Sequence, residues 1–140
     1  MKVLFATDGS ECSNRAAHYL VKSLRGEVKD LTVTLFYVDL RMMDRVAAAL
    51  GEQRVAEIHQ ENADKNLKGA RQRLKRARIA FDEAHTAGNA PYCISRKAET
   101  GKYDLVLMGS HGRSAFKSVM LGSVTARVLA ECRVPVLVVH

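Results

Sequence analysis

The sequence predicts an α/β fold with a mostly parallel sheet, because apolar strand patterns alternate with amphipathic helical patterns along its 140 residues. The first strand pattern, Lys2–Thr7, is continuously apolar from Val3 to Ala6, as expected of a central strand covered on both faces. A helical pattern follows it, and the alternation recurs to the end of the sequence. No linker, repeat or low-complexity segment interrupts it, so we expect a single domain over residues 1–140.

Apolar, β-branched and aromatic runs predict five strands, over Lys2–Thr7, Leu31–Val38, Ile79–Thr86, Tyr103–Met108 and Val134–Val139. Apolar residues at helical spacing predict helices over Glu11–Arg25, Asp39–Leu50, Gly51–Ala77, Tyr92–Thr100 and Val124–Cys132. Ser10 is the expected N-cap of the first helix, and Gly26 is its expected end. Pro91 suits the first turn of a helix, whereas Pro135 suggests that the last strand lies at an edge of the sheet.

The segment Met108–Val124 has features that favour phosphate binding. Gly109 and Gly112 follow a strand, and glycine allows backbone N–H groups to approach a ligand closely and tolerates positive φ. Gly122 and Ser123 then precede a helix, for which Ser123 is the predicted N-cap, and a helix N-terminus offers free N–H donors to an anion.

Arg113 and Lys117 add positive charge between these glycines. The spacing is neither a Walker A loop nor a G-x-G-x-x-G fingerprint, and Met108 stands where a nucleophile elbow needs glycine. The residues alone therefore leave two interpretations open, a polyphosphate cradle or an ordinary glycine-rich β–α connection.

The spacing Gly109-x2-Gly112-x9-Gly122-Ser123 resembles the nucleotide-binding motif of the universal stress proteins, in the subgroup that binds ATP. Further segments are similar to that family as well. They are the two flanks of the motif, the opening Val3-Leu-Phe-Ala-Thr-Asp-Gly-Ser10 and the ending Val134-Pro-Val-Leu-Val-Val. The resemblance covers the whole chain and is weakest from Leu40 to Ala80.

This resemblance implies a five-stranded parallel sheet in the order 3-2-1-4-5 with helices on both faces, the adenine nucleotide alpha hydrolase-like arrangement. Strands one and four then flank the switch point where ligands bind. The site residues that it implies are Ala6, Thr7, Asp8, Val38, Met108, Gly109, His111, Gly112, Arg113, Gly122, Ser123 and Val124. Ala6, Thr7 and Val38 match positions beside the adenine base.

Three side chains near this site have open roles. Asp8 either contacts the nucleoside, as the resemblance implies, or hydrogen-bonds its own turn. His111 either lines the phosphate region or stabilises the loop. We do not expect Ser110 and His111 to act as nucleophile and base, since sequence neighbours in a turn rarely hydrogen-bond in that way. Many family members carry histidine where Tyr37 stands, which affects the packing of the second strand.

Two classes of function fit these residues. The first is a regulator in stress survival that uses ATP occupancy as its signal. The second is a slow ATPase or nucleotidyl-transfer enzyme, in which Asp8 and Ser123 hold Mg²⁺ through the phosphates. No acidic residue lies within the cradle, so we favour the regulator.

Net charge +7 attracts anions, and much of it lies in Lys65–Arg78. No aromatic residue interleaves these charges to stack bases, so we expect a solvated helix face rather than a nucleic-acid surface. Cys12 and Cys132 fall on apolar helix faces and are expected to be buried thiols, with no disulfide or zinc site. No signal peptide or membrane-length apolar run is present, which favours the cytoplasm.

The last strand, Val134–Val139, also predicts a homodimer. An apolar edge strand without charges leaves free backbone groups that must be covered. The family resemblance implies the same, since its members commonly dimerise through this strand. The competing interpretation is that Leu40–Leu50 covers the strand within its own chain.

Overall fold

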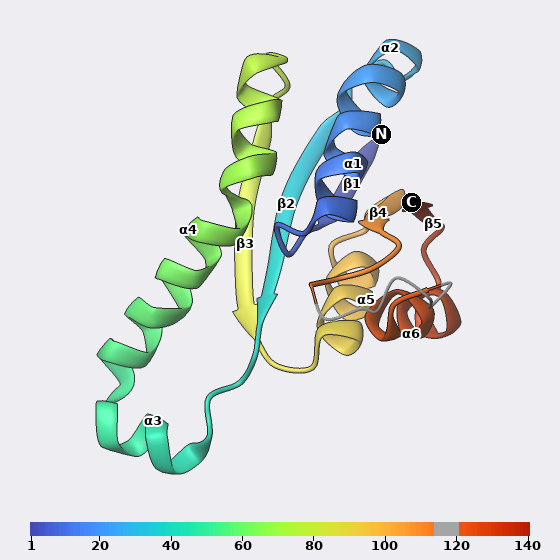
Figure 1. Cartoon of the computed structure of the whole chain (residues 1–140). Helices are drawn as coiled ribbons and strands as arrows, with labels where there is room; N and C mark the ends of the chain where they lie inside the picture. Colours follow the sequence, from blue (N-terminus) through green and yellow to red (C-terminus); the bar gives the residue numbers. More distant parts are fainter. Residues whose placement is uncertain (114–120) are drawn as a thin grey trace.

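The computed structural model describes residues 1–113 and 121–140, which form a five-stranded parallel sheet with helices on both faces (Figure 1). The strand order is β3-β2-β1-β4-β5, which confirms the order expected from the sequence. The strands are β1 Lys2–Ala6, β2 Thr32–Asp39, β3 Phe81–Ala87, β4 Leu105–Gly109 and β5 Val136–Val139. β1 pairs with both β2 and β4 and is therefore central, whereas β5 lies at an edge, as Pro135 indicated.

The helical segments are α1 Glu11–Tyr19, the π-helical turn η1 Leu20–Leu24, α2 Arg25–Glu27, α3 Asp44–Leu50, α4 Glu52–Arg76, α5 Ala90–Thr100 and α6 Ser123–Glu131. The helix expected over Glu11–Arg25 is thus interrupted by a π-helical turn. Gly26 lies inside α2 and does not end the helix, so that prediction was wrong. Gly51, expected to begin the long helix, separates α3 from α4 with a φ of +83°.

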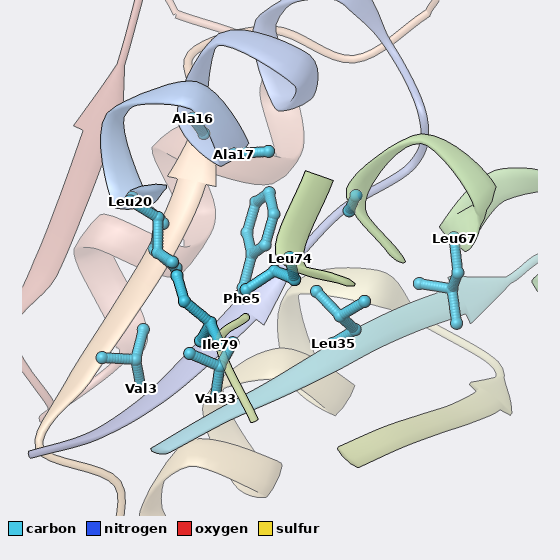
Figure 2. Close-up of a cluster of buried hydrophobic side chains, with 12 residues drawn as sticks. Val3, Phe5, Ala16, Ala17, Leu20, Val33, Leu35, Leu67, Leu74 and Ile79 are labelled. Carbon is cyan, nitrogen blue, oxygen red and sulfur yellow. The ribbon is translucent and has the colours of Figure 1, made fainter. Parts of the chain in front are cut away.

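One layer of the core lies between the sheet and the helices α1 and α4. Phe5 of β1 is fully buried there beside Leu35 of β2 (Figure 2). Leu20 of η1 and Leu74 of α4 close over them, and both are fully buried. The apolar side chains of the basic stretch Lys65–Arg78 belong to this layer, so its charges lie on the outer face of α4.

The second layer lies on the other face of the sheet, under α5 and α6. Leu4 and Val106 from the sheet pack there with Val128 of α6. Cys12 and Cys132 are half-buried rather than buried, which corrects the expectation for both thiols. Because β1 contributes alternate residues to both layers, its carboxyl end is held rigidly where the functional residues begin.

Candidate functional site

The loops after β1 and β4 meet at the carboxyl edge of the sheet, at the switch point of the strand order. A Cβ added at Gly112 would lie 2.8 Å from Oδ2 of Asp8, so the two loops are in direct contact. Ser10 Oγ also donates a hydrogen bond to the backbone oxygen of His111, at 3.2 Å. The two segments that the sequence singled out are therefore brought together in one crevice.

Asp8 builds the turn that starts α1. Its Oδ1 accepts hydrogen bonds from Ser10 N at 3.0 Å and from Ser13 Oγ at 2.8 Å. Gly9 takes a φ of +72°, a conformation that favours glycine, and Ser10 caps the helix as expected. The turn role of Asp8 is thus confirmed for Oδ1, while Oδ2 lies toward Gly112.

Gly109 makes a packing contact that its motif does not suggest. A Cβ at this position would lie 2.7 Å from the backbone C of Cys12 and 2.7 Å from the backbone N of Ser13. The first turn of α1 therefore packs directly on the end of β4. Neither Gly109 nor Gly112 has a positive φ. Close approach to backbone favours glycine at position 109, whereas a Cβ at position 112 would meet only the Asp8 side chain.

Ser110 and His111 do form a hydrogen bond, between Ser110 Oγ and His111 Nδ1 at 2.9 Å. A hydrogen bond between these neighbours, expected to be rare, is therefore present. Ser110 is only 1% exposed, however, so its hydroxyl is buried away from a substrate. The contact stabilises the loop and does not present a nucleophile.

A cavity of about 350 Å³ opens at this crevice, within the size range of small-molecule sites. Most of the residues expected at the site line it, namely Ala6, Thr7, Asp8, Val38, Met108, Gly109, His111, Gly112, Arg113 and Val124. Gly122 and Ser123 are not among its lining residues, and Lys117 lies outside the described residues.

Gly122, rather than Ser123, is the N-cap of α6, which corrects the predicted cap. Its backbone N–H donates to the oxygen of Ser110 at 2.8 Å, and an added Cβ would lie 3.2 Å from Cα of His111. Gly122 thus holds the start of α6 against the loop that follows β4. Ser123 is the first helical residue and is exposed.

The wall between β2 and α4 was not predicted from the sequence. Tyr37, Asp39 and Leu40 from the end of β2 line the cavity, together with Asn66 of α4. One signal was available: Asn66 is a polar residue within the apolar spacing of a long helical pattern. The contact between strand and helix could not be derived from the sequence, because the partners are far apart along the chain.

Asp39 organises this wall. Its Oδ2 accepts from Asn62 Nδ2 at 2.8 Å and lies 2.7 Å from Nδ1 of His59, both on α4. Its Oδ1 accepts from the Tyr37 hydroxyl at 3.0 Å and from Leu40 N at 2.9 Å. Burial raises the pKa of Asp39, but these four hydrogen bonds outweigh it and hold the pKa below its ordinary value. Burial and the neighbouring Asp39 carboxylate raise the pKa of Tyr37 to about 12.

The lowered pKa of Asp39 predicts an acid-dependent contribution to stability. A carboxyl group with a lower pKa in the folded state than in the unfolded state stabilises the fold at every pH above its unfolded-state pKa. This contribution is lost as the pH falls through the folded-state pKa. We expect Asp39→Asn to lower the free energy of unfolding at pH 7 by about 1–3 kcal/mol, because the amide cannot accept the same four donors. Urea unfolding from pH 5 to pH 2 should show wild type and variant converging. A constant difference across that range would contradict this role.

Among residues 1–113 and 121–140, no group of three or more His, Cys, Asp or Glu side chains is arranged to hold a metal ion. In the same residues, no helix is both long and apolar enough to span a bilayer. Arg71 in the basic stretch is ion-paired with Asp64 and Glu83, while Lys65 and Lys68 are exposed.

The fold and the crevice define a doubly wound α/β protein whose loops form a cavity at the topological switch point, the place where such sheets bind ligands. The chain belongs to the universal stress protein family, whose family model matches residues 1–140.

Two relatives illustrate the range of the family. The universal stress protein Slr1230 from Synechocystis is 32% identical over 136 residues, which cover 97% of this chain and 41% of Slr1230. The universal stress protein MJ0577 from Methanocaldococcus jannaschii is 27% identical over 151 residues, which cover 99% of this chain and 93% of MJ0577. The chain thus spans less than half of Slr1230 but nearly all of MJ0577.

Solved structures agree with this fold. The structure of MJ0577 matches with a TM-score of 0.79 at 28% identity, covering 99% of this chain and 94% of the other. A universal stress protein solved in complex with cAMP matches with a TM-score of 0.71 at 23% identity, covering 100% of this chain and 97% of the other.

Proposed function

We propose that this chain, acting as a single cytoplasmic domain, binds ATP in the crevice between Asp8 and the loop after β4. ATP occupancy would be its signal as a regulator in stress survival. The observation that carries the proposal is the cavity at the switch point of the sheet. The site residues expected from the sequence line this cavity, except Gly122 and Ser123. A structural neighbour in complex with cAMP supports an adenine nucleotide as the ligand class.

The proposed contacts divide the cavity into two ends. Ala6, Thr7 and Val38 would lie beside the adenine. The Oδ1 atom of Asp8 already accepts hydrogen bonds within its turn, so its Oδ2 atom would contact the nucleoside. The remaining contacts would come from the second glycine-rich segment and its flanks, that is Met108, Gly109, His111, Gly112, Arg113, Gly122, Ser123 and Val124. Mg²⁺ would be held through the phosphates of ATP.

Arg113 provides the test of this arrangement. Its Nη2 lies 3.1 Å from where a Cβ of Gly9 would stand, so its charge lies beside the turn after β1, and the residue lines the cavity. We expect Arg113→Ala to weaken ATP binding by about 1–3 kcal/mol and adenosine binding far less, because only ATP offers phosphates to a guanidinium.

Calorimetric titration of ATP and of adenosine measures both affinities. Arg73→Ala, an exposed arginine of α4 outside this cavity, is the matched control for lost charge. Mass spectrometry of denatured, freshly purified protein should detect an adenine nucleotide at near-equimolar level. Equal losses for ATP and adenosine in Arg113→Ala would count against phosphate contact at this loop.

We further propose that the chain forms a homodimer through its last strand. The oxygens of Pro135 and Val139 accept hydrogen bonds from Val106 N and Ser110 N of the β4 side. Backbone groups alternate along a strand, so those of Val136 and Val138 point to the open edge. Antiparallel pairing with a two-fold copy would satisfy both edges at once, with the isologous symmetry that most dimers use.

A further inference from the structure

Asn66 is a buried polar residue in the wall of the cavity. Asn66 is 5% exposed, and its side-chain Nδ2 donates a hydrogen bond to the backbone oxygen of Asn62 at 2.8 Å. Its Oδ1 is buried and has no hydrogen-bond partner among residues 1–113 and 121–140. Buried side-chain acceptors nearly always have a partner, so this oxygen calls for a donor that the described residues do not supply.

Asn66 is held at the cavity by the turn after β1. A Cβ added at Gly9 would lie 3.0 Å from the backbone oxygen of Asn66, so α4 is pressed against this turn. The amide orientation is fixed as well, because Nδ2 is the atom that can donate to the Asn62 carbonyl. The backbone of Asn66 therefore lies beside the turn that carries Asp8, and its side chain is oriented by the bond to Asn62.

Two neighbouring groups of this wall, Tyr37 and Asn62, do not provide the missing donor. The Tyr37 hydroxyl donates its proton to Asp39, which leaves only lone pairs on its oxygen. The side-chain amide of Asn62 donates a hydrogen bond to Asp39 Oδ2. The α4 side of the cavity thus offers acceptors at Asn66 and Tyr37, and it suits a ligand group that donates.

We propose that Asn66 is a specificity-determining residue whose Oδ1 accepts a hydrogen bond from the nucleoside part of the ligand. This inference rests on the proposed function of the cavity. Phosphate oxygens are acceptors and would be repelled by Oδ1, whereas a nucleoside carries donors on its ribose hydroxyls and on the adenine amine. The nucleoside part of the ligand is therefore the part that lies against Asn66.

The first test uses the wild-type protein and four ligands, ATP, 2′-deoxyATP, 3′-deoxyATP and purine riboside triphosphate. Each analogue removes one donor, a ribose hydroxyl or the adenine amine. We expect one of them to bind about ten-fold more weakly than ATP in calorimetric titration, because it leaves the buried oxygen unpaired. That analogue identifies the donor. Equal affinity for all four ligands would overturn the inference, and this test needs no folded variant.

The second test repeats the series with Asn66→Leu, which has a similar volume and no acceptor. ATP should bind about ten-fold more weakly, and the difference between ATP and the discriminating analogue should disappear. Gln72→Leu, an exposed amide on the same helix and outside the cavity, is the matched control and should leave the whole series unchanged.

The possible failures are distinguishable. If the losses from Asn66→Leu and from the analogue simply add, Asn66 acts through packing alone and the inference is wrong. If the wild type binds ATP but shows no discrimination, only the role of Asn66 fails. If the wild type binds none of the four ligands, the proposed function fails and the inference fails with it.

Discussion

Gly109→Ala is expected to destabilise the chain by about 1–3 kcal/mol or more, through overpacking between β4 and α1. The added methyl group would stand 2.7 Å from two backbone atoms, the C of Cys12 and the N of Ser13. Backbone cannot rotate away as a flexible side chain can, so the whole first turn of α1 must shift. That shift also displaces Ser13, which donates to Asp8, so ATP binding should weaken in the same variant.

Thermal and urea unfolding of Gly109→Ala measure the expected loss. Gly26→Ala is the matched control, since no heavy atom lies within 4 Å of its added Cβ and the residue is in the short helix α2. Alanine favours helix over glycine, so the control should be neutral or slightly stabilising. Equal stability of the two variants would mean that α1 does not depend on glycine at the end of β4.

The glycine spacing of the crevice could be recognised from the sequence, whereas its physical reasons could not. Gly109 was expected to allow close approach of a ligand, and the structure shows a second reason for glycine, because its added Cβ meets the backbone of α1. Gly112 faces the Asp8 carboxylate, a contact between segments about a hundred residues apart. Local patterns report which conformations a residue tolerates, and tertiary contacts decide which neighbour makes the small residue necessary.

The central strands β1, β2 and β4 were predicted well because largely apolar runs are a direct signal of central parallel strands. Helix ends were predicted less well. Gly122 took the N-cap position expected for Ser123, since its backbone is fixed by the bond from its N–H to Ser110. The helix after Ser10 continued past Gly26 through a π-helical turn, for which the sequence carries no recognisable signal.

The α4 wall was missed for a related reason. Asp39 and His59 are 20 residues apart, and their contact depends on how α4 crosses the end of β2. A polar residue in an apolar pattern marked Asn66 as unusual, but only the fold shows that it lines the cavity. Such residues are where a candidate site gains specificity beyond its family motif.

Val138→Pro is expected to convert the proposed homodimer into a monomer. The N–H of Val138 points to the open edge of β5, so proline there removes an intermolecular donor and no bond of the sheet itself. Lysine at this position would be a less direct test, because the Val138 side chain packs on the core layer under α6.

Sedimentation at micromolar concentration should show wild type as a dimer and Val138→Pro as a monomer. His85→Pro is the matched control at the opposite edge of the sheet. Gly88 N donates to Asp39 O of β2, and successive N–H groups of β3 point to opposite sides. The N–H of His85 therefore points outward, away from β2. The control should remain dimeric, since that edge carries Asp82 and Glu83, charges that discourage strand pairing. A monomeric wild type would disprove the dimer. A dimer that persists in Val138→Pro would place the interface away from β5, because antiparallel edge pairing needs the outward N–H groups of that strand.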